Sequence, residues 1–181
     1  MRIGLFGGSF NPPHLGHAMV SAWLLWSDRV DEVWLVPTYD HPFAKELKPF
    51  TARVSLVEAL AKTVGPKVSV CQVEKDLPQP SYSLQTLRHL QNLHKSHSFH
   101  LVVGADVLLD VGDWHRWDLI VEEFDPIIVG RVGYDSVDGS PQFPQISSSK
   151  IREMLASGED VSHLVDKSSL KSVVGLYGSL G

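Results

Sequence analysis

The stretch RIGLFGGSFNPPHLGH, residues 2–17, decides the fold of this chain. Arg2 to Phe6 form a short, mostly apolar run, which predicts a buried β-strand, and two glycines end it. A proline-containing loop then leads to residues 17–26, HAMVSAWLLW, whose wide apolar face predicts a helix. A strand that passes through a glycine turn into a helix is typical of open parallel sheets, which bind ligands at the carboxyl ends of their strands.

The same alternation of short apolar runs and helical patterns continues along the chain, and it predicts a parallel sheet covered on both faces. The other expected strands are residues 32–36, 68–73, 99–103 and 126–129. The other expected helices are residues 51–62, with Thr51 as the cap, 83–94, 114–124 and 147–156. We therefore expect an α/β, Rossmann-like fold with a mostly parallel sheet of about five to six strands. Residues 1–181 are expected to form a single domain, with about 160–181 as its helical extension.

The composition excludes several classes of protein. With 16 Lys and Arg against 21 Asp and Glu, the net charge of −5 argues against a nucleic-acid partner, which needs a basic face. Cys71 is the only cysteine, so the chain can form neither an internal disulfide nor a cysteine-based zinc site. No stretch approaches the roughly 20 apolar residues of a membrane span, and the first apolar run is too short for a signal peptide. We expect a cytoplasmic protein with no membrane partner; the oligomeric state stays open, with a homodimer among the options.

The glycine turn and the two histidines after it have the properties of a phosphate site. Gly7 and Gly8 let backbone N–H groups approach an anion closely, and Gly16 keeps that approach open. His17 falls at a helix N-terminus, where a partial charge of roughly +0.5 favours phosphate. With His14 it would stabilise the charge that develops on an α-phosphate during in-line attack. The stretch matches neither the P-loop nor the dinucleotide-binding G-x-G-x-x-G pattern.

Two histidines three residues apart also fit a metal site, or surface positions with no special role. No carboxylate or third histidine lies in the same loop, and the nine histidines of the chain are scattered without ligand spacing. A zinc- or iron-binding protein is therefore only a third hypothesis.

A second candidate phosphate site is ISSSKIR, residues 146–152, which opens a late helix. Ser147 or Ser148 can cap that helix, and three hydroxyls with exposed N–H groups can cradle a phosphate. Arg152, one turn into the helix, can reach the same anion with its fork of donors. Taken alone, the string is equally compatible with an ordinary capped helix and a solvated arginine.

Together the two strings resemble the two signatures of the HxGH nucleotidyltransferase superfamily, which transfers a nucleoside monophosphate from a nucleoside triphosphate. His14-Leu15-Gly16-His17 matches the first signature, with His at its first position, as in nicotinate-mononucleotide adenylyltransferases. Residues 146–152 resemble the second signature, ISSTxIR, with Ser149 in place of Thr. The resemblance spans roughly Arg2 to Arg152 and implies the nucleotidyltransferase form of the Rossmann-like fold.

The resemblance also implies residue roles. Catalytic roles are implied for His14, His17, Lys45 and Arg152, with Lys48 as the second candidate for the lysine. Contacts with ATP are implied for Gly7, Gly8, Ser9, Phe10, Gly16, Gly104, Asp106, Ile146, Ser147, Ser148 and Ser149. Asp106 ends Gly104-Ala105-Asp106, which matches the GxD of the family and would meet the adenosine ribose; a capping Asp in a strand-end turn is the alternative.

Acceptor-binding roles are implied for Tyr82, Ser83, Trp114 and Arg131. Residues 81–87 resemble the SYTxxTL string of the family, and Trp114 matches the tryptophan that stacks on the pyridine ring, although its pattern also fits a core residue. Arg131 resembles the arginine of an Arg-Pro-Gly string, with Val in place of Pro. The loop at residues 37–48 departs from the Pro-Pro-His-Lys/Arg string that the family usually has there.

The resemblance thus implies an enzyme that transfers an adenylyl group from ATP to nicotinate mononucleotide, giving nicotinate adenine dinucleotide and pyrophosphate in NAD biosynthesis. Mg²⁺ would be the cofactor, held mainly by the nucleotide and water, with no ligand from protein side chains. Two hypotheses stay open beside this one. The first is adenylyl or cytidylyl transfer to another phosphate acceptor, such as nicotinamide mononucleotide or a phosphopantetheine-like compound. The second is a nucleotide-binding regulator without catalysis.

Overall fold

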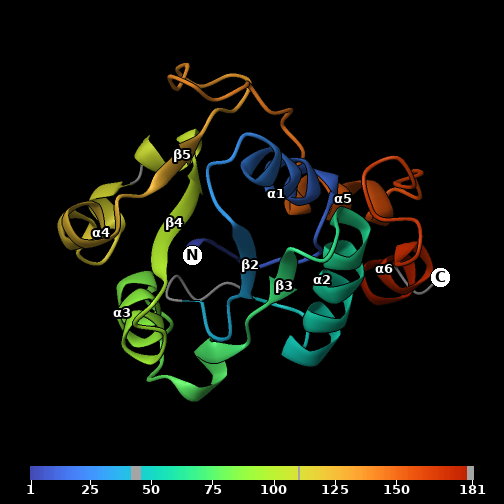
Figure 1. Ribbon diagram of the computed structural model, residues 1–181. Coiled ribbons are helices and arrows are strands. Elements are labelled where there is room, and N and C mark those ends of the chain that lie inside the picture. The colour runs from blue at the N-terminus through green and yellow to red at the C-terminus, as the bar shows by residue number, and fades with distance from the viewer. Residues whose placement is uncertain (42–45, 110, 179–181) are drawn as a thin grey trace.

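Five parallel strands form the centre of the protein in a computed structural model that describes residues 1–41, 46–109 and 111–178. The strands are β1 (Arg2–Gly8), β2 (Glu32–Pro37), β3 (Val68–Val70), β4 (Ser98–Gly104) and β5 (Ile127–Val129). Their order is β3-β2-β1-β4-β5, and every pair is parallel (Figure 1). The order changes direction between β1 and β4, and a crevice for ligands is expected outside the carboxyl ends of those two strands. The predicted parallel α/β sheet is confirmed.

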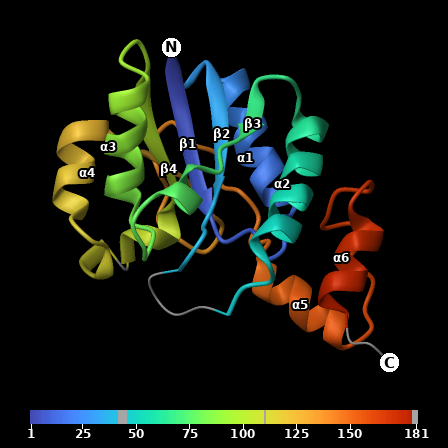
Figure 2. The ribbon, with the colours of Figure 1, turned by 90° about the horizontal axis from the view of Figure 1, so that it is seen from below.

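Helices cover both faces of this sheet (Figure 2). Helices α1 (Leu15–Trp26) and α2 (Phe50–Val64) lie on one face, where Leu24 and Leu60 pack on Leu35 of the sheet. Helices α3 (Ser83–Leu93) and α4 (Trp117–Phe124) lie on the other face, where Leu87 and Ile120 belong to a second buried cluster. Because both faces are covered, the central parts of the strands are apolar on both sides, which explains the short apolar runs of the sequence.

The start of α2 differs from the expectation. Pro49 occupies the N-cap position, so Thr51 lies inside the helix and is not its cap. The carbonyl of Pro49 accepts the first helical hydrogen bond, from the N–H of Arg53 at 3.1 Å. Proline has no backbone N–H, and at the start of a helix an N–H would have no acceptor within the helix. Proline is therefore well suited to this position.

Two other elements are shorter than expected. Helix α4 begins at residue 117, because Arg116 adopts a left-handed backbone conformation (φ 55°), and Trp114 lies in the turn before it. Strand β3 ends at residue 70, and the chain then forms a 3₁₀ turn at residues 73–76. The cap of α5 (Ser148–Ala156) is as predicted, since the Ser147 hydroxyl accepts from the N–H of Lys150 at 3.2 Å.

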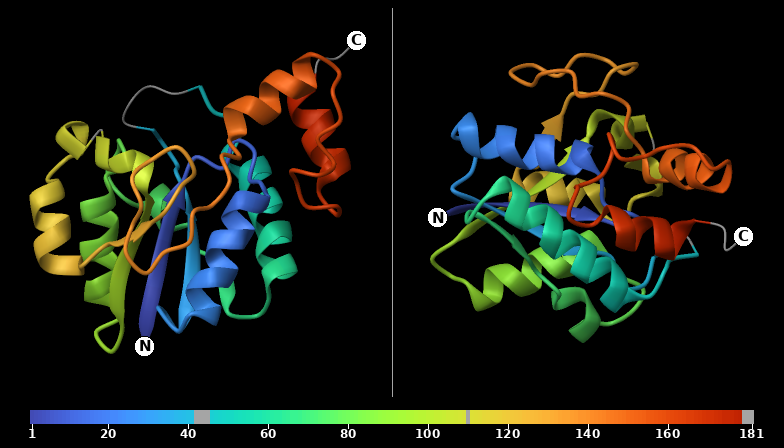
Figure 3. Two further views of the ribbon diagram at one scale, coloured as in Figure 1. Left: turned by 90° about the horizontal axis from the view of Figure 1, so that it is seen from above. Right: turned by 90° about the vertical axis from the view of Figure 1, so that its right-hand side faces the viewer.

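The last part of the chain packs beside α2. Helices α5 and α6 (Leu170–Tyr177) share a third buried cluster with Leu56 of α2. Asp166, just before α6, accepts from the Thr63 hydroxyl of α2 at 2.7 Å. Figure 3 shows that this packing brings the start of α5 next to the loop that follows β1.

Three segments at the carboxyl edge of the sheet are joined by the buried side chain of Arg53, which is 1% exposed. Its guanidinium donates to three carbonyl oxygens, each at 2.8 Å: those of Ser9 after β1, Thr38 after β2 and Lys48 before α2. Because one rigid fork serves all three, it fixes these segments relative to one another.

We expect Arg53→Met to destabilise the fold by about 2–4 kcal/mol, because it leaves three part-buried carbonyl groups without donors. Urea unfolding followed by circular dichroism measures this loss. Arg88→Met is the matched control, since it removes a surface ion pair, with Glu123, and such pairs contribute little. Equal losses for the two variants would contradict a special role for Arg53.

Candidate active site

The crevice at the carboxyl ends of β1 and β4 contains two adjoining pockets. The first has a volume of about 360 Å³ and the second about 180 Å³. Residues that line both pockets are Gly7, Ser9, Val102, Val103 and Trp114. Two ligands bound in these pockets would therefore meet at the turn after β1.

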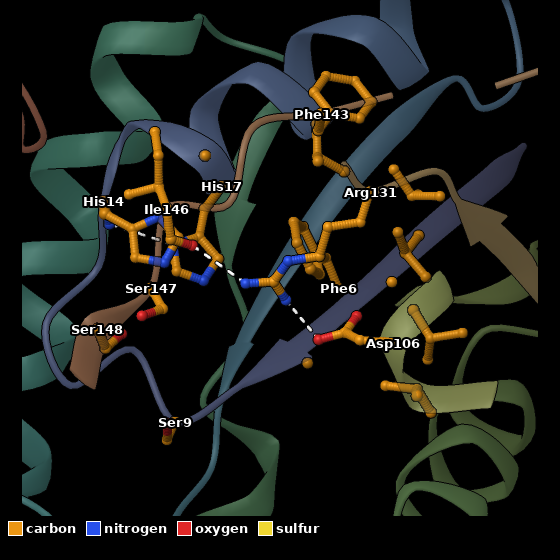
Figure 4. Close-up of a pocket in the computed structure, with 18 of the residues that line it drawn as sticks. Phe6, Ser9, His14, His17, Asp106, Arg131, Phe143, Ile146, Ser147 and Ser148 are labelled. Atoms are coloured by element: carbon orange, nitrogen blue, oxygen red, sulfur yellow. Dashed lines mark hydrogen bonds and ion pairs between the residues drawn. The ribbon is translucent and has the colours of Figure 1, made fainter. Parts of the chain in front are cut away.

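The first pocket brings together residues from the two ends of the sequence. His14 and His17 line it together with Ser147, Ser148 and Arg152. Figure 4 shows the histidines and serines on one side of this pocket and Asp106 on the other, with Arg131 between them. Ile146, Ser149, Gly16 and Gly104, also predicted from the sequence, line the same pocket.

Direct contacts hold these two ends of the chain together. The Arg152 guanidinium donates to the carbonyl oxygen of Asn11 at 2.6 Å and to the Ser149 hydroxyl at 3.2 Å. The Ser148 hydroxyl donates to the carbonyl oxygen of Pro12 at 2.7 Å. The start of α5 is thus docked onto the loop after β1, and its dipole favours an anion in the pocket.

The two imidazole rings are stacked, with their centroids 3.8 Å apart. The backbone N–H of His14 donates to Nδ1 of His17 at 3.1 Å, and the N–H of His17 donates to the carbonyl of His14 at 2.9 Å. Since Nδ1 of His17 accepts a hydrogen bond, a neutral ring carries its proton on Nε2. His17 is thus a hydrogen-bond donor of fixed tautomer.

Both rings are neutral at physiological pH. Burial lowers the pKa of His14 to about 2, and the positive charges of His17 and Arg131 act in the same direction. Burial also lowers the pKa of His17 to about 4, and the positive charge of Arg131 acts in the same direction. The pair can therefore donate hydrogen bonds to phosphate without bringing a net charge into the site.

Gly16 and Gly104 have a steric role that the sequence did not reveal. A Cβ on Gly16 would lie 2.9 Å from Nδ1 of His14, so the glycine makes room for that ring. A Cβ on Gly104 would clash with the carboxylate of Asp106. At Gly7, by contrast, an added Cβ would have no atom of the described residues within 4 Å apart from its neighbours in sequence, so it would occupy space that the pocket leaves for a ligand.

Phe10 supports the site from behind. The side chain is 1% exposed, lines neither pocket, and packs with its ring centroid 4.7 Å from that of His17. Its backbone is left-handed (φ 43°), a costly conformation for a bulky residue, and it turns the chain sharply after Ser9.

Asp106 and Arg131 form an ion pair inside the first pocket. Arg131 also donates to the carbonyl oxygen of Ile146 at 3.4 Å. Arg131 lines the first pocket and is absent from the lining of the second. The structure thus places it beside the predicted nucleotide residues and Trp114, in a different pocket from Tyr82 and Ser83.

The second pocket contains the other predicted acceptor residues. Tyr82 and Ser83, at the start of α3, line it together with Trp114. Sequence reasoning missed His115, whose ring lies at a tilt against that of Tyr82, with centroids 4.5 Å apart. It also missed Glu74, which is 7% exposed, and neither residue stood in a motif that could have revealed it.

Glu74 organises the wall of the second pocket. Its carboxylate accepts from the N–H of Tyr39 at 3.1 Å and from the Thr86 hydroxyl at 3.5 Å. Burial raises the pKa of this carboxyl, and its hydrogen bonds oppose that shift. The loop after β2 is in this way attached to α3.

The candidate lysines are distributed differently. Lys45 lies outside the described residues. Lys48 lines neither pocket. Its side-chain ammonium lies 5.9 Å from the ring centroid of Tyr177 in α6, and its backbone N–H donates to the Asn11 side chain at 3.2 Å.

Within residues 1–41, 46–109 and 111–178, no three His, Cys, Asp or Glu side chains are grouped closely enough to hold a metal ion. In the same part of the chain, no helix has the length and apolar character needed to cross a bilayer.

A Rossmann-like sheet with a phosphate pocket built by two histidines and a serine-rich helix start defines a nucleotidyltransferase. The cytidylyltransferase-like family model matches residues 5–154, and the chain belongs to that family. It is 44% identical to a probable nicotinate-nucleotide adenylyltransferase of Anaeromyxobacter sp. (strain K), over 97% of this chain and 96% of that protein. It is 33% identical to a protein of the same description from Myxococcus xanthus, over 98% of this chain and 95% of that protein.

Among solved structures, the fold resembles Plasmodium falciparum nicotinic acid mononucleotide adenylyltransferase complexed with NaAD. The TM-score is 0.80 at 19% identity, and the match covers 96% of this chain and 95% of that one. At this identity the likeness supports the fold alone.

The buried neutral histidines predict an acid-sensitive fold. The pKa values of about 2 and about 4 in the folded protein lie below the ordinary 6.5 of the unfolded chain. Below pH 6.5 the unfolded chain therefore binds more protons than the folded protein, and the free energy of unfolding decreases as the pH is lowered. Each ring contributes a slope of about 1.4 kcal/mol per pH unit. We expect the free energy of unfolding, measured in urea between about pH 6.5 and about pH 5, to change less with pH in the double variant His14→Gln/His17→Gln than in the native chain. Parallel slopes would mean that the rings are protonated in the fold.

Proposed function

We propose that this enzyme transfers the adenylyl group of ATP to nicotinate mononucleotide, releasing pyrophosphate and forming nicotinate adenine dinucleotide. The observation that carries the proposal is the pair of pockets that share the wall formed by Gly7, Ser9 and Trp114, at the turn after β1. Such a wall lets a nucleotide and a second mononucleotide meet at one phosphorus atom. The names of the curated relatives support this pair of substrates.

In the first pocket, the triphosphate would lie against the start of α5 and the two histidines. The described residues offer no backbone acceptor to the N–H groups of Ser148 and Ser149, so these donors can bind phosphate oxygens. Nδ1 of His14 is buried without a partner in the described part of the chain. An unpaired buried polar atom costs stability, and a bound ligand or its water would relieve that cost.

In the second pocket, an aromatic acceptor would lie among the rings of Tyr82 and Trp114. Planar side chains stack favourably on a pyridine ring, and Ser83 adds a hydroxyl beside them. The mononucleotide phosphate would then point toward the turn after β1, where the α-phosphate of ATP is held. Lys45 stays a candidate for a further cation near these phosphates.

The transfer needs no general base. A monoester phosphate with a second pKa near 6 is mostly a dianion at neutral pH, so its oxygen can attack the α-phosphorus directly. The N–H at Nε2 of His17 would donate to the oxygen on which negative charge accumulates, and Arg152 would fix the chain segment that holds the triphosphate. Positioning of the two substrates then supplies most of the rate acceleration.

Mg²⁺ fits this site as an ion that arrives with the nucleotide. Among the described residues, the carboxylates that line the first pocket are Glu46 and Asp106, and Asp106 is already paired with Arg131, so phosphate oxygens and water would supply most of the ligands. When bound, the ion neutralises part of the triphosphate charge. Since ATP is available in the cytoplasm, we place the reaction there.

Acceptor identity is tested by pyrophosphate release from ATP with a panel of acceptors. We expect nicotinate mononucleotide to be at least about 10-fold better in kcat/KM than nicotinamide mononucleotide, because a site built for a carboxylate leaves donors unpaired around an amide. Phosphopantetheine, which has no ring to stack, should be inactive. Activity with another acceptor alone would replace the proposed substrate, and tight ATP binding without any release would indicate a regulator.

His17→Ala should lower turnover by about 100-fold or more, the scale of losing one donor to a transition-state oxyanion. The measurement is steady-state pyrophosphate release with saturating substrates. His163→Ala, at an exposed position that lines neither pocket, is the control and should retain native turnover. Near-native turnover of His17→Ala would remove this ring from the mechanism.

A further inference from the structure

Arg131 lies in the middle of the first pocket, between residues of its opposite sides. It follows β5, and its guanidinium lies between the histidines and Asp106 (Figure 4). One end of the fork is paired with the Asp106 carboxylate, and the other donates to the Ile146 carbonyl at 3.4 Å. The side chain is 26% exposed, so it faces the space that a ligand would enter.

The hydrogen-bonding capacity of Arg131 is largely unused. A guanidinium has five N–H donors, and in the part of the chain that the structure describes only these two acceptors meet them, the second at a long distance. Arg152, the other arginine of this pocket, donates to the Asn11 carbonyl at 2.6 Å and is committed to holding the fold. Arg131 therefore keeps donors that are free to serve an anion, and one of its two present contacts is long.

The position of Arg131 suits the polyphosphate. Its positive charge contributes to the low pKa of both His14 and His17, so it lies within electrostatic reach of the two rings. The start of α5 is equally close, because Arg131 donates to Ile146, two residues before that helix. A phosphate chain in contact with the histidines and α5 would thus pass beside this guanidinium.

The backbone at Arg131 is firmly anchored. The N–H of Val132 donates to the carbonyl of Phe143 at 2.8 Å, and the N–H of Phe143 donates to the carbonyl of Gly130 at 3.1 Å. A Cβ on Gly130 would lie 2.6 Å from the carbonyl oxygen of Pro141, so the two chain segments that begin and end this loop are in close contact. A change of partner by Arg131 therefore needs only rotation of its side chain.

We propose that Arg131 is a nucleotide-binding residue that exchanges Asp106 for the polyphosphate when ATP enters the first pocket. The planar fork matches two phosphate oxygens, and the nucleotide brings more negative charge than one carboxylate. Before ATP binds, pairing with Asp106 keeps both groups from being unpaired in a part-buried site. After the exchange, the Asp106 carboxylate is free to accept from a hydroxyl of the nucleoside. This inference rests on the proposed function and deepens it.

The test is calorimetric titration of the enzyme with ATP and, separately, with adenosine, which lacks phosphate. Arg131→Met should lower the affinity for ATP by roughly 10- to 100-fold, the range for losing charge-assisted hydrogen bonds, and should not weaken adenosine binding. Arg131→Lys, which keeps the charge without the fork, should fall between Met and the native residue. The control Arg88→Met removes an arginine–carboxylate pair outside both pockets and should bind both ligands as the native enzyme does.

Two results would overturn the proposal. Equal losses for ATP and adenosine would make Arg131 a support for Asp106 only, and unchanged ATP affinity with a raised KM for the acceptor would return it to the acceptor. Should Arg131→Met fail to unfold cooperatively in urea, Arg131→Lys decides by the same comparison of ATP with adenosine. Titrations without an acceptor do not require turnover, so they remain decisive if the acceptor panel shows no pyrophosphate release.

Discussion

The contact between the start of α5 and the loop after β1 is the constraint on which the site depends. Arg152 and Asn11 are separated by 141 residues in the sequence, and their hydrogen bond at 2.6 Å brings the two segments of the proposed phosphate site onto one pocket. One segment supplies the imidazoles, and the other supplies the N–H groups at the start of a helix. The third buried cluster, around Ile151 and Leu56, supports this contact by fixing α5 on α2. The buried cluster shared by α2, α5 and α6 therefore fixes the position of the α5 start in the crevice.

The electrostatics of the crevice follow from burial. If both histidines were protonated, they would add two positive charges to those of Arg131 and Arg152 in the same pocket. Burial of the two rings disfavours their protonation and so prevents this accumulation of charge. The chain instead holds neutral rings next to Arg131, which is paired with Asp106. This arrangement keeps the net positive charge of the empty pocket low.

The sequence allowed the fold and the first pocket to be predicted because both depend on local patterns. Apolar runs identified the five strands, and the glycine turn marked the carboxyl edge where the site lies. Contacts distant in sequence were not predictable. Thr51 had the chemistry of a cap, but Pro49 takes that place, and Arg116 delays α4 by adopting a left-handed conformation. The spatial partner of Arg131, on another strand end, likewise had no local signal.

The second pocket shows why acceptor choice is harder to predict than nucleotide binding. Its walls come from the loop after β2, the 3₁₀ turn after β3, the start of α3 and the turn before α4, and Glu74 and Arg53 tie several of these segments together. Each segment is irregular, so its conformation depends on buried hydrogen bonds more than on propensity. A change in the loop at residues 37–48 can therefore be accommodated while the rings of Tyr82 and Trp114 keep their places. The proposed stacking surface of Tyr82 and Trp114 comes from the start of α3 and the turn before α4, outside the loop that departs from the family string.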